Sequence, residues 1–179
     1  MEKDKIKEGI EAMKVFDSTR SKVERAGLII PEKPLDANNK TNLFTEWTQM
    51  KSKYGGIGNI PFNELGEFLD RWTALISYTR WVEAVADIEQ QSAREIRDTV
   101  KKQLYVNQDG NREMKDALVH TDDTFISLEK DYNEKLALYV AIKGLREGYE
   151  TRSNAISREI TRRTQDTGDL RRGGNRGGA

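Results

Sequence analysis

The most constraining feature of the sequence is a helical spacing of apolar residues that begins after Pro61 and persists for about forty residues. Apolar or small side chains recur every three or four positions, at Leu65, Leu69, Trp72, Ile76, Thr79, Val82, Val85 and Ala86, and then at Ile96, Val100 and Leu104. This spacing places one apolar stripe along a single face of an α-helix. It predicts one long helix, or two helices stacked end to end, with Pro61 at the first helical position.

A second stripe of the same kind predicts a helix from about residue 125 to residue 163. Its members are Leu128, Tyr132, Leu136, Tyr139, Ile142, Leu145, Tyr149, Ile156 and Ile160. Asp122, Asp123 or Thr124 can cap the beginning of this helix. Gly144 and Gly148 interrupt it at a cost of about 1 kcal/mol each relative to alanine, so we expect a kink or a close helix contact there.

No segment alternates apolar and polar residues for long enough to indicate a strand, so the sequence predicts an all-α fold. The turn VNQDGN and a short helix, EMKDALVH, join the two long helices, which should form an antiparallel hairpin over residues 61–163. The stripes are too narrow to be buried completely within one chain. We therefore expect packing of the coiled-coil kind between copies, and a homo-oligomer.

A smaller helical region precedes the hairpin, over residues 1–60. A narrow stripe made of Ile6, Ile10, Met13, Phe16 and Val23 predicts a helix over residues 3–25. Gly27 should end it, and Pro31 and Pro34 indicate a connector. A shorter helix is expected from about residue 40 to residue 53. After Arg163 the apolar period disappears, and residues 164–179 should form a disordered tail rich in arginine and glycine.

The composition limits the class of protein. Apolar residues make up 36% of the chain and charged residues 34%, with equal numbers of acidic and basic side chains. There is no cysteine, so disulfides and thiolate metal sites are excluded. The charged N-terminus has no apolar core of the signal-peptide kind, and no run of about 18 apolar residues exists. These features predict a soluble protein of the cytoplasm, or of the host-cell cytoplasm if a phage encodes it.

The residues that catalysis requires are scarce. His120 is the only histidine, and a general base needs an oriented partner, so it is expected at the surface or as a helix cap. The stretch GGIG at residues 55–58 lacks the lysine of a phosphate loop. Asp109, Glu113 and Lys115 resemble the acidic pair and lysine of metal-dependent nucleases, but they lie in a turn and a helix start rather than on neighbouring strands. We expect neither an enzyme nor a metal or cofactor site.

The neutral total charge hides an uneven distribution. Residues 107–134 carry eight acidic and three basic side chains, whereas residues 143–179 carry nine basic and five acidic ones. Candidate nucleic-acid contacts in the basic part are Arg152, Arg158, Arg162 and Arg163 on the last helix and Arg171, Arg172 and Arg176 in the tail. A second basic spot combines Lys101 and Lys102 with Tyr105, a ring that could stack on a base. The same arginines could equally complete a helix C-terminus, where cations are favoured.

The order of these elements resembles the UvsY family of phage recombination mediators over residues 64–163. The most specific match is REMKDALVHTDDTFISLEKDY, in which Glu113, Met114, Lys115, Leu118 and Asp122 fall as they do in that family. The resemblance implies a small helical protein that forms a ring, binds single-stranded DNA, and helps to load a RecA-type recombinase while displacing the single-strand binding protein.

The family's DNA-contact motif is a lysine and an arginine two positions apart, followed by an aromatic pair. Lys101 and Tyr105 fall on this motif, while Thr99 and Leu104 occupy two of its other positions and Lys102 adds a charge. The site could therefore lie at Lys101 and Lys102 or on the arginine-rich helix and tail. An alternative function is a phage-type structural or assembly protein, such as a scaffolding, neck or chaperone component, without DNA affinity.

Overall fold

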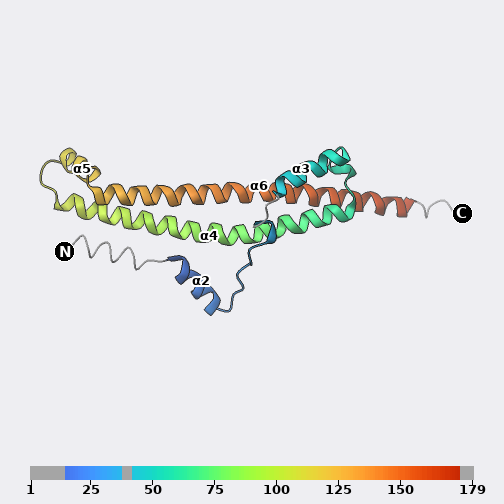
Figure 1. The fold of residues 1–179 in the computed structure, drawn as a ribbon, viewed down its shortest axis with the longest axis horizontal. Coiled ribbons are helices and arrows are strands. Elements are labelled where there is room, and N and C mark those ends of the chain that lie inside the picture. Colours follow the sequence, from blue (N-terminus) through green and yellow to red (C-terminus); the bar gives the residue numbers. More distant parts are fainter. Residues whose placement is uncertain (1–14, 38–41, 174–179) are drawn as a thin grey trace. The chain divides into compact units, whose positions relative to one another are not determined.

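The computed structural model describes residues 15–37 and 42–173 (Figure 1). Its helices are α2 (Val15–Arg25), α3 (Leu43–Tyr54), α4 (Phe62–Asn107), α5 (Arg112–His120) and α6 (Asp123–Gly173), with 3-10 turns η1 (Leu35–Ala37) and η2 (Ile57–Asn59). No strand occurs in these two ranges, which confirms the all-α prediction.

The chain divides into two compact units, and α4 and α6 each contribute to both. The corner unit contains Met1–Ile30 and Trp81–Lys143, and so includes the connection from α4 through α5 to α6. The aromatic unit contains Pro31–Arg80 and Gly144–Ala179. Both units combine segments that are distant in sequence.

The aromatic unit is built around a core that α3, α4 and α6 share. Its buried members are Leu43, Trp47, Ile60, Leu65, Phe68, Trp72, Leu75 and Ile156. Phe44 of α3 meets the ring of Trp72 edge-on, with ring centroids 5.2 Å apart, and Tyr149 of α6 lies 5.7 Å from Trp72. The predicted helix near residues 40–53 therefore packs on the first part of α4 and the last part of α6.

Ion pairs attach the connector that precedes α3 to this unit. Arg71 of α4 contacts Asp36 of η1 at 2.6 Å and Glu46 of α3 at 2.8 Å. The carboxylate of Asp36 accepts two hydrogen bonds from the Arg71 guanidinium, a geometry that is stronger than a single contact. The connector containing Pro31 and Pro34 is thus fixed at its C-terminal end.

In the corner unit α4 and α6 run antiparallel. The guanidinium carbon of Arg97 lies 4.3 Å from the ring centroid of Tyr132, and Lys101 Nζ lies 5.7 Å from that of Phe125. Later residues of α4 therefore lie beside earlier residues of α6. In the aromatic unit Arg163 of α6 reaches the Ile60 carbonyl just before α4, whereas Arg80 further along α4 pairs with Glu150 earlier in α6, which gives the same antiparallel sense. The predicted antiparallel pairing is present in each unit.

The helix ends follow the capping signals in the sequence. The Asn42 side chain accepts a hydrogen bond from the amide of Phe44 at 2.9 Å, and Asn111 caps α5 in the same way. Among the three candidates for the start of α6, Asp122 is the cap, because its Oδ1 accepts from the Thr124 amide at 2.8 Å. Gly27 ends α2 with a φ of 74°, the left-handed conformation that favours glycine.

One expectation about the long helices needs correction, and one of the two alternatives for Gly144 and Gly148 is excluded. α6 continues to Gly173, so the segment from residue 164 to residue 173 is helical and the prediction that the helix ends at Arg163 is wrong. No close helix contact occurs at Gly144, where an added Cβ would meet nothing within 4 Å, and at Gly148 such an atom would meet only Arg152 of the same helix. The remaining tail residues, 174–179, lie outside the described part of the chain.

Candidate nucleic-acid interface

Three cationic or titratable side chains lie beside the rings of Tyr105 and Phe125 in the corner unit. Lys101 Nζ lies 3.3 Å from His120 Nε2, and Lys115 Nζ lies 5.7 Å from the centroid of the Tyr105 ring. His120 also meets the ring of Phe125 edge-on at 5.0 Å. We call the set Lys101, Lys102, Tyr105, Lys115 and His120 the basic corner.

The basic corner is assembled from the end of α4 and from α5. Val119 of α5 and Phe125 of α6 are buried, and His120 of α5 contacts both Lys101 of α4 and the ring of Phe125. Lys102 is exposed, and it makes no hydrogen bond or ion pair with any residue in the described ranges. Tyr105 is half-buried, with the Lys115 ammonium near its ring.

The sequence pattern identifies two of these lysines and Tyr105 but does not connect Lys115 and His120 with them. In the sequence Lys115 stands beside Asp109 and Glu113, and His120 is expected only at the surface or as a helix cap. The available signal is the length of the connection. α5 follows α4 after a four-residue turn, residues 108–111, so a helix of only nine residues must lie close to the end of α4.

Arg152, in the aromatic unit, packs on the aromatic core. Its guanidinium carbon lies 4.4 Å from the ring centroid of Phe44 and 5.9 Å from that of Trp72. One guanidinium nitrogen donates to the carbonyl oxygen of Gly148 at 2.7 Å. Its cationic group therefore already has aromatic and carbonyl partners within the unit.

Arg163 fastens the turn η2 to α6. Its Nη1 donates to the carbonyl of Ile60 at 2.6 Å, and its Nη2 donates to the carbonyl of Ile57 at 2.8 Å. Its Nε donates to Glu159 Oε1 at 2.7 Å. This guanidinium supplies donors to two carbonyls of the turn, one of which, Ile57, also accepts from the Ile60 amide, and so it stabilises the turn.

Arg162 is exposed but has carboxylate partners on its own helix. It contacts Glu159 at 2.7 Å and Asp166 at 2.9 Å. Hydrogen bonds from Arg162 and then from Arg163 lower the pKa of Glu159 to about 2, so this carboxylate is ionised at neutral pH. Part of the positive charge on Arg162 is therefore neutralised locally.

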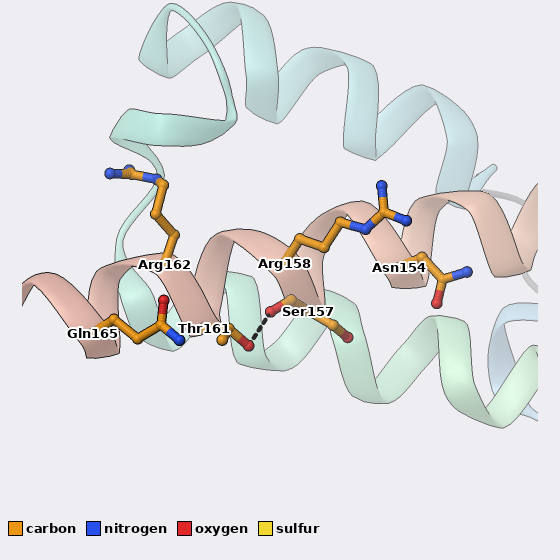
Figure 2. A pocket seen from close by; sticks show the side chains of 6 residues that line it. All are labelled: Asn154, Ser157, Arg158, Thr161, Arg162 and Gln165. Carbon is orange, nitrogen blue, oxygen red and sulfur yellow. Dashed lines mark hydrogen bonds between the residues drawn. The ribbon is translucent and has the colours of Figure 1, made fainter.

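Arg158 differs from these three arginines. It is exposed and has no hydrogen bond or ion pair with any described residue. It lines an open groove of about 420 Å³ along α6, together with Asn154, Ser157, Thr161, Arg162 and Gln165. Figure 2 shows the Arg158 and Arg162 side chains extending from the α6 ribbon, with the four neutral side chains along the same helix.

The three arginines predicted to contact nucleic acid from a disordered tail do not all fall in such a segment. Arg171 and Arg172 belong to the last turn of α6, because the helix runs to Gly173. Arg176 lies outside the described residues.

In the part of the chain that the structure describes, no three His, Asp or Glu side chains come together in a way that could hold a metal ion. No helix within those residues has both the length and the apolar character needed to cross a membrane.

Comparison with known proteins finds no matching family model, no matching curated protein and no matching solved structure. The resemblance to UvsY-type mediators accordingly depends on the residues quoted from the sequence.

Proposed function

We propose that this chain is an oligomeric single-stranded DNA-binding protein that acts as a recombination mediator, helping to load a RecA-type recombinase and displace a single-strand binding protein. The observation that carries the DNA-binding part is the basic corner, where Lys101 lies beside His120, Lys115 lies near the ring of Tyr105, and Lys102 is exposed. The mediator role and its partners come from the UvsY-like run.

The chemistry of the basic corner suits a single strand. Lysine ammonium groups neutralise phosphates, and the ring of a tyrosine offers a face on which an unstacked base can stack. Lys115 near the Tyr105 ring can exchange this contact for one with a phosphate at little cost, because an exposed cation–π contact is worth about 0.5–1 kcal/mol.

Acidic residues restrict how strong this binding can be in one subunit. α5 carries Glu113 and Asp116 beside Lys115, and Asp109 lies in the preceding turn. Because the whole chain has no net charge, attraction to DNA must be local and must weaken steeply with salt. Several copies acting on one strand would increase the affinity without any new contact.

An exposed apolar face of α6 supports assembly of copies. Leu138 and Val140 are 52% and 57% exposed, and Ala137 and Ala141 beside them are exposed as well. Leucine and valine flanked by alanines allow another helix to approach closely, as in helix bundles. We propose that this face packs against a second copy in a homo-oligomer, which could close into a ring.

Fluorescence anisotropy of a labelled single-stranded oligonucleotide at low and moderate salt tests DNA binding directly. The double variant Lys101→Ala/Lys102→Ala should weaken binding several-fold and reduce the salt slope by about 1.4, because each lysine that neutralises a phosphate of a single strand adds about 0.7 to that slope. Lys33→Ala/Lys143→Ala is a matched control, since both lysines are exposed and the net charge changes equally.

Wild-type protein that does not bind the oligonucleotide even at low salt would refute the proposed function. If the wild type binds and the Lys101/Lys102 variant binds equally well, the proposal for the basic corner fails and the site moves to α6.

A structural or assembly protein remains the second candidate, and the ion pairs of Arg162 favour it. Glu159 and Asp166 neutralise Arg162 on its own helix, as expected of a solvated helix surface without a polyanion. In that case exposed faces such as the one at Leu138 would contact copies or partners. Cross-links between the arginine-rich part of α6 and residues 107–134 of another copy, without DNA affinity, would support this candidate.

A further inference from the structure

The groove around Arg158 has a composition unlike the rest of the arginine-rich helix. Arg152 and Arg163 are committed to the core and the turn, and Arg162 is paired with carboxylates. Arg158 is the arginine in this part of α6 that keeps its full charge available among the described residues. A fully charged, exposed guanidinium with five donors is a ready contact for an oxyanion.

Neutral hydrogen-bonding side chains extend this charge along the helix. Asn154, Ser157, Thr161 and Gln165 line the same groove. From residue 154 to residue 165 the helix rises about 16 Å, so the groove is a strip rather than a pocket for one small anion. Arginine together with serine, threonine, asparagine and glutamine is the usual set of phosphate and sugar contacts in nucleic-acid complexes.

We propose that the strip Asn154, Ser157, Arg158, Thr161, Arg162 and Gln165 is a second nucleic-acid contact, one that binds the phosphodiester backbone and does not stack on bases. This inference rests on the proposed function and deepens it by defining the substrate class of the helix surface. Because no aromatic side chain lines the strip, its affinity does not depend on unstacked bases, and it accepts single strands and duplexes alike.

Arg162 can contact a phosphate only after its ion pair with Asp166 is broken. Asp166, one of its partners, is 63% exposed, so the Arg162–Asp166 pair is a surface ion pair worth about 0–1 kcal/mol. A phosphate oxygen can replace Asp166 at that small cost, whereas Glu159 stays bound to Arg162 and Arg163. Arg158 should therefore contribute more to binding than Arg162.

Two other ligands fit the strip less well. A membrane surface would need apolar side chains to insert beside the charges, and none lines the groove. An acidic peptide offers carboxylates, but donors spread over about 16 Å of helix match a regular polyanion better than a few irregular charges.

The test compares Arg158→Gln with the wild-type protein. It measures the affinity of each for a labelled single-stranded oligonucleotide and for a duplex of the same length. Arg158→Gln should weaken both several-fold, and it should flatten the slope of log affinity against log salt by about 0.7 for the single strand and about 0.9 for the duplex. Arg158→Lys should recover most of the salt slope because it keeps the charge. Circular dichroism should be unchanged, since the Arg158 side chain makes no hydrogen bond or ion pair with the described residues.

The outcomes separate this inference from the proposed function. One outcome would overturn the inference and leave the proposed function standing. In it the wild type binds the oligonucleotide, Lys101→Ala/Lys102→Ala weakens that binding, and Arg158→Gln leaves it unchanged. If Arg158→Gln weakens the single strand but not the duplex, the backbone-only contact is wrong. Equal competition by a polyglutamate of the same charge would make the strip a protein-binding surface and overturn the inference. No binding of either nucleic acid by the wild type would overturn both.

Discussion

Replacing Arg163 by methionine should destabilise the aromatic unit much more than the same change at its neighbour Arg162. Arg163 donates to the carbonyls of Ile57 and Ile60 at 2.8 and 2.6 Å, and its side chain is 22% exposed. Hydrogen bonds to a charged group contribute about 1.5–3 kcal/mol each, and the substitution leaves both carbonyls without this donor. The two bonds sum to about 3–6 kcal/mol, and we expect the lower end, about 3 kcal/mol, because methionine keeps the apolar stem and the Ile57 carbonyl keeps the Ile60 amide as a donor.

Thermal unfolding followed by far-ultraviolet circular dichroism measures this loss. A chain of this size loses about 2–4 °C of Tm per kcal/mol, so Arg163→Met should melt about 6–12 °C below the wild type. Arg163→Lys should recover little of this, because a single ammonium cannot reproduce the fork that reaches two carbonyls and Glu159 together.

Arg162→Met is the matched control. The Arg162 side chain is 57% exposed, and its contacts with Glu159 and Asp166 lie on the helix surface. Such pairs contribute about 0–1 kcal/mol, so its Tm should fall by no more than about 4 °C. If Arg163→Met and Arg162→Met melt at the same temperature, the turn does not depend on Arg163 and the structural role assigned to it is wrong.

Three further predictions concern pH, the aromatic core and assembly. The pKa of Glu159 is about 2 in the folded protein and about 4.3 in an unfolded chain, so the stabilisation from its carboxylate is complete above about pH 4.5 and is lost as the pH falls toward 2. The Tm of Glu159→Gln should therefore be below that of the wild type at pH 6 and should approach it near pH 2. A Tm difference that stays constant with pH would contradict this prediction. Arg152→Met should lower the free energy of unfolding, measured with urea, by about 1–2 kcal/mol, because it removes the cation–π contact at 4.4 Å between Arg152 and the Phe44 ring. The control Arg158→Met should lower it by nothing measurable. Equal urea midpoints for the two variants would contradict the packing role of Arg152. Leu138→Glu should weaken self-association, measured by light scattering, at least tenfold, because it would bury an unpaired carboxylate between two copies. A wild type that is monomeric at all concentrations would refute the proposed interface.

The hairpin was predictable because its stripes are long. Leu65, Trp72 and Ile156 lie on the predicted faces and are fully buried. The sequence left open whether the part after Pro61 is one helix or two, and the structure gives one, α4. The caps were predictable for a local reason, because asparagine and aspartate side chains satisfy amides only two or three residues away.

The arginines were harder to assign, although the sequence held a signal. Arg152, Ile156, Ile160 and Arg163 continue the spacing of three and four, so both arginines stand on the apolar stripe of α6. Arg158 stands off the stripe. This periodicity separates the two arginines that pack in the unit from Arg158, which has no hydrogen bond or ion pair with the described residues.

The end of α6 could not be found from apolar periodicity. The segment after Arg163 has no apolar face, yet it stays helical to Gly173. The ion pair between Arg162 and Asp166 joins residues four apart across the predicted end, and such pairs favour the helix by about 0.2–0.5 kcal/mol. An exposed helix end is decided by local effects of this size, which a search for a buried stripe does not detect.

The burial of Trp47 and Trp72 gives the aromatic unit an optical reporter, to which Trp81 of the corner unit adds a third indole. These two of the three indoles are 4% and 0% exposed, and within the described residues the ring nitrogen of Trp72 has no hydrogen-bond partner. Their emission should be blue-shifted and should move to longer wavelength when this unit opens to water. Melting curves from emission and from helix content would therefore coincide only if both units unfold in one cooperative step.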